Sequence, residues 1–211
     1  GRKISETVAS KMKRLSLELG GKKPTLFFKD ANLKKHLKMI VRSSFLNQGE
    51  ICLCGSRIYA EREIYETFVS EFVREAKELV VGDPEDRKTF MGPLVSKEHR
   101  DKVADFVQGA VEAGFEICLG GAAPLNLDKG FYFSPTVLTP KSTAGSVQGM
   151  TGLHASKIQL EEVFGPVVTI MPFDSVDEVV ALANSTRYGL AASIWTEPRC
   201  CRVIFVCLLA V

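Results

Sequence analysis

Apolar residues recur every three or four positions in several stretches of the chain, and each such stretch predicts an amphipathic helix. These stretches are residues 4–17, 33–45, 64–79, 103–111 and 179–183. Short runs of aliphatic, aromatic and β-branched residues predict strands at 17–22, 24–29, 57–60, 115–119, 167–171 and 190–195. Strands that alternate with helices indicate an α/β fold with a mostly parallel, helix-covered sheet.

Polar residues at the ends of these stretches predict where helices begin and end. Asp30 and Ser96 are expected to cap the second and fourth helices at their N-termini. Ser175 and Glu178 have the spacing of a capping box, and Gly114 is a suitable C-terminal stop. The apolar stripes between these signals are expected to form the core.

Composition and charge restrict the class of protein. The chain has 211 residues, enough for one domain with a sizeable core or for most of a larger domain. Its net charge is only +2, with basic and acidic residues interleaved, so a small-molecule ligand is expected rather than nucleic acid. The sequence contains no apolar run of the ~18 residues that span a bilayer, so no membrane partner is expected.

The six cysteines are irregularly spaced, which predicts free thiols in a reducing, cytoplasmic compartment. A zinc site is disfavoured because the cysteines form no matched pairs with ligand spacing and the three histidines are scattered. No metal site is therefore predicted. The cysteines are Cys52, Cys54, Cys118, Cys200, Cys201 and Cys207.

Cys52 and Glu18 are the residues most suggestive of catalysis. Cys52 follows a glycine-containing turn, where a loop can present a thiolate to a substrate. Glu18 lies in an apolar run before Gly20 and Gly21, where a partly buried carboxylate would suit activation of water. Each has a simpler interpretation, since most such cysteines are small buried hydrophobes and a glutamate beside two glycines can merely end a strand.

The two stretches together resemble the NAD(P)-dependent aldehyde dehydrogenase superfamily. The segment 17–22, Leu-Glu-Leu-Gly-Gly-Lys, is similar to the glutamate signature of that family, and 49–52, Gly-Glu-Ile-Cys, is similar to its cysteine signature. The separation between Glu18 and Cys52 also matches. A third segment, 161–166, resembles the motif that contacts the nicotinamide end of the cofactor, and the resemblance extends over residues 1–196.

The resemblance implies oxidation of an aldehyde to a carboxylic acid with NAD or NADP, NAD being favoured. Cys52 would be the nucleophile, forming a thiohemiacetal and then a thioester, and Glu18 would activate the hydrolytic water. Glu162 would hold the nicotinamide ribose and Phe164 would pack near the nicotinamide. Two further cofactor contacts are implied, at Leu19 and at Gly1, which resembles the last glycine of the cofactor-binding turn. Family members form homo-oligomers.

The chain also departs from the family pattern in length and at its ends. Residues 1–20 correspond to the tail end of a Rossmann-like cofactor domain and 21–196 to a catalytic domain truncated at both ends. Residues 143–157 are expected to be an insertion, and 197–211 form an atypical tail without the oligomerisation segments.

Details of the signatures favour the aminomuconic or hydroxymuconic semialdehyde branch, although the aldehyde itself stays open. Two alternative functions remain. One is a catalytically inactive fragment that associates with full-length subunits, and the other is a cofactor-independent thiol hydrolase that uses Cys52 and a histidine.

Overall fold

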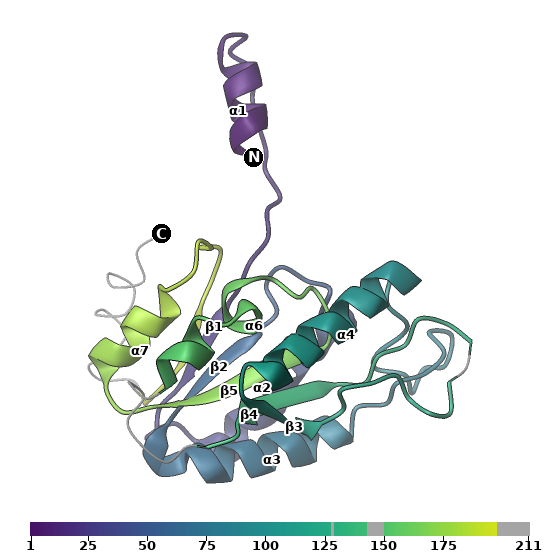
Figure 1. Ribbon diagram of the computed structural model, residues 1–211, viewed down its shortest axis with the longest axis vertical. Helices are drawn as coiled ribbons and strands as arrows, with labels where there is room; N and C mark the ends of the chain where they lie inside the picture. The colour runs from purple at the N-terminus through teal and green to yellow at the C-terminus, as the bar shows by residue number, and fades with distance from the viewer. Residues whose placement is uncertain (128, 143–149, 198–211) are drawn as a thin grey trace.

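The computed structural model describes residues 1–127, 129–142 and 150–197 and shows an α/β fold with a six-stranded sheet (Figure 1). The strands are β1 (Pro24–Phe27), β2 (Arg57–Glu61), β3 (Phe115–Leu119), β4 (Thr136–Pro140), β5 (Val167–Phe173) and β6 (Ser193–Trp195), in the spatial order β3-β4-β5-β2-β1-β6. All neighbouring pairs are parallel except β3 with β4. The predicted mostly parallel, helix-covered sheet is confirmed.

Helices cover both faces of the sheet because its strands bury both sets of alternating side chains. Helices α2 (Leu33–Phe45) and α3 (Tyr65–Lys77) pack against the face that contains Phe27, Ile58 and Ile170. Helices α4 (Lys97–Glu112), α6 (Lys157–Leu160) and α7 (Val176–Ala183) pack against the opposite face, which contains Leu26 and Tyr59. Successive side chains of a strand point to opposite faces of the sheet, so neighbouring residues of one strand belong to different cores.

Aromatic side chains consolidate the core under α2 and α3. The ring of Phe27 in β1 lies 5.0 Å from that of Phe68, and Phe72 lies 6.0 Å from Phe68 and 6.1 Å from Phe45. Such pairs contribute about 0.5–1.5 kcal/mol each beyond area burial. These contacts hold α3 against β1 and the C-terminal end of α2 against α3, and so help to determine where α2 delivers the chain.

Two predicted helix starts are confirmed. Ser96 accepts a hydrogen bond from the backbone N–H of His99, and Ser175 accepts one from the N–H of Glu178. The reciprocal bond of the predicted capping box differs, because the Glu178 carboxylate accepts from the Asp174 N–H. The predicted cap at Asp30 is wrong, because Asn32 is the residue that directly precedes α2 and it accepts from the Lys35 N–H. Asp30 instead accepts from Thr196 and Glu197, so it ties the end of β1 to the residues that follow β6.

The N-terminal part of the chain differs most from the prediction. Helix α1 (Arg2–Ala9) is shorter than the predicted 4–17, buries none of its residues and stands away from the body in Figure 1. The predicted strand at 17–22 is wrong: residues 13–23 have no regular secondary structure. Residues 13–23 come before the first strand, because pairing of β1 with β2 begins only at Pro24 and Arg57.

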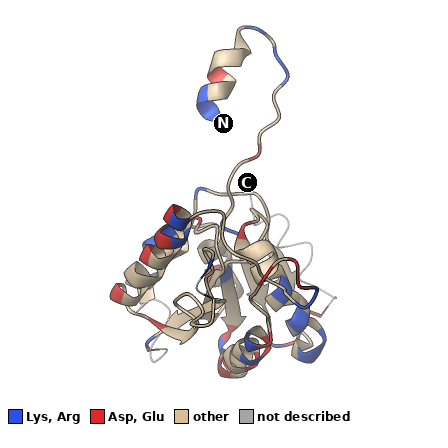
Figure 2. Ribbon diagram, turned by 90° about the vertical axis from the view of Figure 1, so that its right-hand side faces the viewer, with Lys and Arg blue, Asp and Glu red and all other residues tan. Residues whose placement is uncertain are grey.

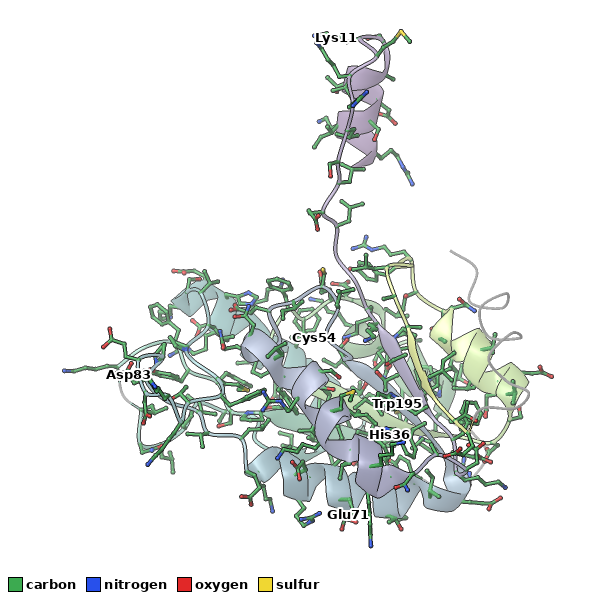
Figure 3. All side chains as sticks on the ribbon, turned by 180° about the vertical axis from the view of Figure 1, so that it is seen from behind. Lys11, His36, Cys54, Glu71, Asp83 and Trp195 are labelled. Atoms are coloured by element: carbon green, nitrogen blue, oxygen red, sulfur yellow. The ribbon has the colours of Figure 1, made fainter. Side chains whose placement is uncertain are left out.

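The remaining elements are short and connect the layers. They are η1 (Leu46–Gly49), η2 (Arg62–Ile64) and α5 (Thr151–His154). Helix α2 reaches the sheet edge, where the ring of His36 lies 4.9 Å from that of Trp195 in β6 (Figure 3). Most of the expected 197–211 tail, and part of the expected insertion, lie outside the described residues.

The described ranges lack the features that mark membrane-spanning helices and metal sites. Basic and acidic residues are interleaved along the helices (Figure 2). None of the helices in these ranges is both long and apolar enough to cross a bilayer. Within the same residues, no three His, Cys, Asp or Glu side chains are grouped as metal ligands would be.

Candidate functional site

The candidate site lies where the chain enters four neighbouring parallel strands. Residues 17–22 lead into β1, the Cys52 loop leads into β2, residues 161–166 lead into β5, and residues 187–190 lead into β6. Parallel neighbours begin at the same edge of a sheet, so segments that are distant in sequence meet there. All three sequence motifs are therefore brought together at the amino ends of the strands.

The Cys52 loop begins with three consecutive residues in the left-handed region. Asn47, Gln48 and Gly49 have φ values of 50°, 58° and 73°. Non-glycine residues in this region cost of order 1–3 kcal/mol each and need support from their surroundings. Asn47 Nδ2 donates to the Glu50 carbonyl at 3.3 Å, and Gln48 Oε1 accepts from the Gly92 N–H at 3.1 Å.

Glycine at position 49 is required by a close backbone contact. A Cβ there would lie 2.2 Å from the carbonyl oxygen of Gly165, in addition to the strain of a positive φ. The cysteine loop therefore packs directly against the 161–166 segment. Because only glycine permits this approach, the separation of the two motifs is set by backbone contact.

The two cysteines of the loop have different surroundings. Cys52 is half-buried, whereas Cys54 is buried and its Sγ lies 3.6 Å from the Leu46 carbonyl oxygen. Burial raises the pKa of the Cys54 thiol to about 11, so Cys54 stays a neutral thiol near neutral pH. Of these two sulfur atoms, that of Cys52 is the better placed to meet a substrate.

The Gly20-Gly21 pair sits between the cysteine loop and Glu162. The Gly21 N–H donates to Glu162 Oε1 at 2.9 Å, and a Cβ on Gly21 would lie 2.4 Å from the Cys52 carbonyl oxygen. A Cβ on Gly20 would lie 2.4 Å from Glu162 Oε2. Gly20 and Gly21 are thus in contact with both of the other motifs.

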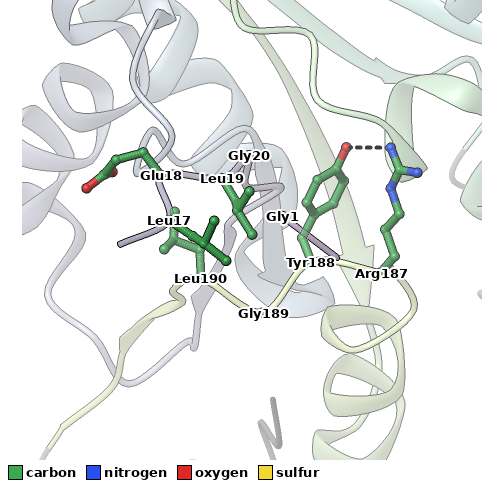
Figure 4. A pocket seen from close by; sticks show the side chains of 9 residues that line it. All are labelled: Gly1, Leu17, Glu18, Leu19, Gly20, Arg187, Tyr188, Gly189 and Leu190. Carbon is green, nitrogen blue, oxygen red and sulfur yellow. Dashed lines mark hydrogen bonds between the residues drawn. The ribbon is translucent and has the colours of Figure 1, made fainter. Parts of the chain in front are cut away.

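Glu18 occupies a different environment from the one predicted. Its side chain is exposed, which corrects the expectation of a partly buried carboxylate in a strand. It lines a cavity of about 710 Å³ together with Gly1, Leu17, Leu19, Gly20 and residues 187–190 (Figure 4). In Figure 4 the Glu18 carboxylate points away from Tyr188, whose hydroxyl accepts a hydrogen bond from Arg187.

Two buried cations lie under the site and were missed by sequence reasoning. Lys22 is 2% exposed and Arg57 is 1% exposed. Burial, the neighbouring Arg57 charge and a smaller opposing effect of Glu162 leave the pKa of Lys22 lowered to about 7. Arg57 donates to the carbonyl oxygens of Lys22, Leu182 and Ala183, and so links the entry to β1 with the C-terminal end of α7.

Phe164 is a predicted site residue whose backbone lies in the left-handed region. Its φ is 58°, its side chain is 39% exposed, and its carbonyl oxygen lies 2.6 Å from His99 Nε2. His99 comes from the first turn of α4, and nothing in its sequence spacing linked it to the motifs. The contact joins residues 65 positions apart, which only the folded chain reveals.

The sequence matches one protein family over nearly its full length. Residues 1–204 match the model of the family described as "Aldehyde dehydrogenase family". The 2-aminomuconic semialdehyde dehydrogenase of Mus musculus is 43% identical over 200 residues, which cover 92% of this chain and 39% of that protein. The 2-aminomuconic 6-semialdehyde dehydrogenase of a Pseudomonas species is 39% identical, with 93% and 38% covered.

The fold of the chain also matches solved structures of aldehyde dehydrogenases. The NAD⁺ complex of an aldehyde dehydrogenase from Bacillus cereus superposes with a TM-score of 0.86 and is 34% identical. The match covers 99% of this chain and 40% of that one. The chain therefore spans about two fifths of the length of the proteins it resembles.

Proposed function

Because this chain belongs to the aldehyde dehydrogenase family, we propose that it contributes the catalytic cysteine to oxidation of an aldehyde to a carboxylic acid with NAD⁺. One observation carries the proposal. Gly21 packs against the Cys52 backbone while its N–H is bound by Glu162, so the three motif segments form one site at the amino ends of adjacent strands.

The residues present fit the nicotinamide end of the cofactor. Gly20 lines the 710 Å³ cavity, a volume in the usual range of small-molecule sites, and its bare Cα lies against the Glu162 carboxylate. Glu162 and Phe164 themselves line a separate, much smaller pocket together with Gly21. That carboxylate accepts one backbone N–H and has further lone pairs for the hydroxyls of a ribose. Glu162 would hold that ribose, exposed Phe164 would pack near the nicotinamide, and Gly1 and Leu19 would contact the cofactor across the cavity.

The reaction begins at the half-buried sulfur of Cys52. Its thiolate forms a bond to the aldehyde carbon, and the carbonyl electron pair moves onto the oxygen. The backbone N–H of Cys52 would stabilise this oxyanion, an interaction worth about 3 kcal/mol in comparable sites. Bound NAD⁺ supplies the acceptor for the hydride that leaves the same carbon, and Cys52 is left as a thioester.

Glu18 would complete the reaction as general base. It takes a proton from water as the water oxygen adds to the thioester carbon, after which the carbon–sulfur bond breaks and the thiolate is regenerated. The exposed Glu18 side chain must turn toward Cys52 for this step. Glu18 is three positions before Gly21, so their Cα atoms lie at most about 11 Å apart, and Gly21 itself packs against the Cys52 carbonyl.

The substrate class and setting are proposed on the similarity of the chain to its relatives. We propose a semialdehyde substrate, supported by the named activity of the mouse and Pseudomonas relatives, and NAD⁺ rather than NADP⁺, supported by the NAD⁺ complexes among the similar structures. Residues 1–20 would belong to the cofactor-binding domain and 21–196 to the catalytic domain. Free thiols at Cys52, Cys54 and Cys118 favour the cytoplasm.

The decisive experiment measures NADH or NADPH formation by the purified chain with aliphatic, aromatic and semialdehyde substrates. Wild type is compared with Cys52→Ser and with Cys54→Ser as the matched control from the same loop. NADH formed by the chain should be abolished by Cys52→Ser and retained by Cys54→Ser. A folded wild-type sample without turnover would favour the alternative of an inactive fragment that associates with full-length subunits. Equal losses in both variants would refute the proposed role of Cys52.

A further inference from the structure

His99 lies at the point where α4 begins and is held there by the helix cap. Its backbone N–H donates to Ser96 Oγ at 3.1 Å, so the position of its imidazole follows from the start of the helix. The side chain is 14% exposed. The imidazole is therefore directed into the molecule, toward the segments that lead into β2 and β5.

The imidazole contacts both the Cys52 loop, at Glu50, and the 161–166 segment, at Phe164. His99 Nε2 lies 2.6 Å from the Phe164 carbonyl oxygen and 3.5 Å from Glu50 Oε1. A carbonyl oxygen can only accept, so the geometry assigns the proton to Nε2. The ring of His99 also meets the edge of the Phe164 ring, with centroids 6.2 Å apart.

The carboxylate of Glu50 extends this contact to the cysteine loop. Glu50 is two residues before Cys52, its side chain is 11% exposed, and its Oε1 also accepts from the Val95 N–H at 3.3 Å. The segment from Val95 to His99 therefore binds the loop through Glu50 and the neighbouring motif through the Phe164 carbonyl. Strained backbone needs such external support to keep one conformation.

We propose that His99 is a positioning residue that holds the Phe164 carbonyl and the Glu50 carboxylate together, and thereby sets the geometry of the Cys52 loop relative to the cofactor-contacting segment. The proposal rests on the proposed function of Cys52, and it assigns to α4 a role in the reaction that none of the sequence motifs covers. His99 does not touch the reacting atoms; it acts through Glu50 and Phe164.

The test compares two substitutions of the same residue. His99→Phe keeps a ring of similar shape but removes the N–H donor, whereas His99→Gln restores a donor that can reach the Phe164 carbonyl. Amide hydrogen exchange of the full chain is measured in peptides covering residues 46–56 and 161–167, with peptides from α3 and β5 as references. Thermal unfolding reports whether the variants remain folded.

We expect His99→Phe to accelerate exchange in both peptides by about fivefold to tenfold, the effect of one buried hydrogen bond, without a change in the reference peptides. His99→Gln should exchange like wild type. If exchange in the two peptides does not respond, or rises equally throughout α4 and the sheet, the positioning role is wrong and His99 is only part of the general packing.

Measuring NADH formation distinguishes the positioning role of His99 from the proposed function of Cys52 on which it rests. If wild type forms NADH, His99→Phe should lower kcat with little change in KM for the aldehyde, and His99→Gln should recover kcat. If wild type forms none, the proposed function fails, but the exchange experiment still decides whether His99 holds the two segments together.

Discussion

Replacing Lys22 with methionine removes a buried ammonium group while preserving an unbranched side chain of similar length. Lys22 is 2% exposed, and burial with the nearby Arg57 charge lowers its pKa from 10.5 to about 7 in the folded protein. Because the folded pKa lies below the unfolded one, the unfolded chain binds this proton more tightly. Burial of the charged Lys22 ammonium therefore lowers the free energy of unfolding. This loss is complete below pH 7 and disappears as the pH rises toward 10.5.

The magnitude follows from the two pKa values. Between about pH 7 and about pH 9 the folded state loses the proton while the unfolded state keeps it, which increases the free energy of unfolding by about 2 kcal/mol. Lys22→Met lacks this contribution, so the stability of wild type relative to the variant should rise by that amount. All other titrating groups cancel in the comparison to the extent that they are independent of Lys22.

Urea denaturation followed by circular dichroism at both pH values measures the difference. Lys38→Met, which removes an exposed lysine from α2, is the matched control and should show no such pH dependence. A wild-type minus Lys22→Met difference that stays constant from pH 7 to 9 would show that the Lys22 ammonium is not desolvated, and the reasoning from burial would fail.

Two further predictions concern the cysteine loop. Gly49→Ala should lower the free energy of unfolding by about 2 kcal/mol or more, because of its positive φ and the contact with Gly165. Gly109→Ala, in a helical position with open space, should raise it by about 0.5–1 kcal/mol; equal effects in urea titrations would contradict the packing argument. Alkylation by iodoacetamide, followed by peptide mapping, should be much slower at Cys54 than at Cys52 at pH 8. The alkylation rate of Cys54 should increase about tenfold per pH unit toward its pKa of about 11. A rate that reaches a plateau below about pH 9.5 would be inconsistent with that pKa.

Prediction from the sequence succeeded where a few neighbouring residues decide the structure. The caps at Ser96 and Ser175 depend on a side-chain oxygen and a backbone N–H three residues later, a relation visible in the spacing. The Asp30 cap failed because Asn32, nearer the helix start, took that role while Asp30 found a partner 166 residues away in Thr196. Local signals could not distinguish these two polar residues.

The candidate site divides in the same way. The positions of Cys52, Glu18, Glu162 and Phe164 were singled out from motifs in the sequence, together with the need for glycine beside them. The exposure of Glu18 was not predicted, because burial of a carboxylate in a segment without regular structure depends on which other segments cover it.

Amino-acid order was sufficient to establish the alternation of strands and helices, the apolar faces of α2, α3 and α4, and the two signature segments, since these depend on periodicity and short spacing. Contacts across the sheet decided the rest. The Gly21 N–H meets Glu162 across 141 residues, and the Phe164 carbonyl meets His99 across 65. The first pair exists because parallel strands place their amino ends at one edge, and the second because the first turn of α4 meets the segment that leads into β5. No local pattern specifies which segments will meet there.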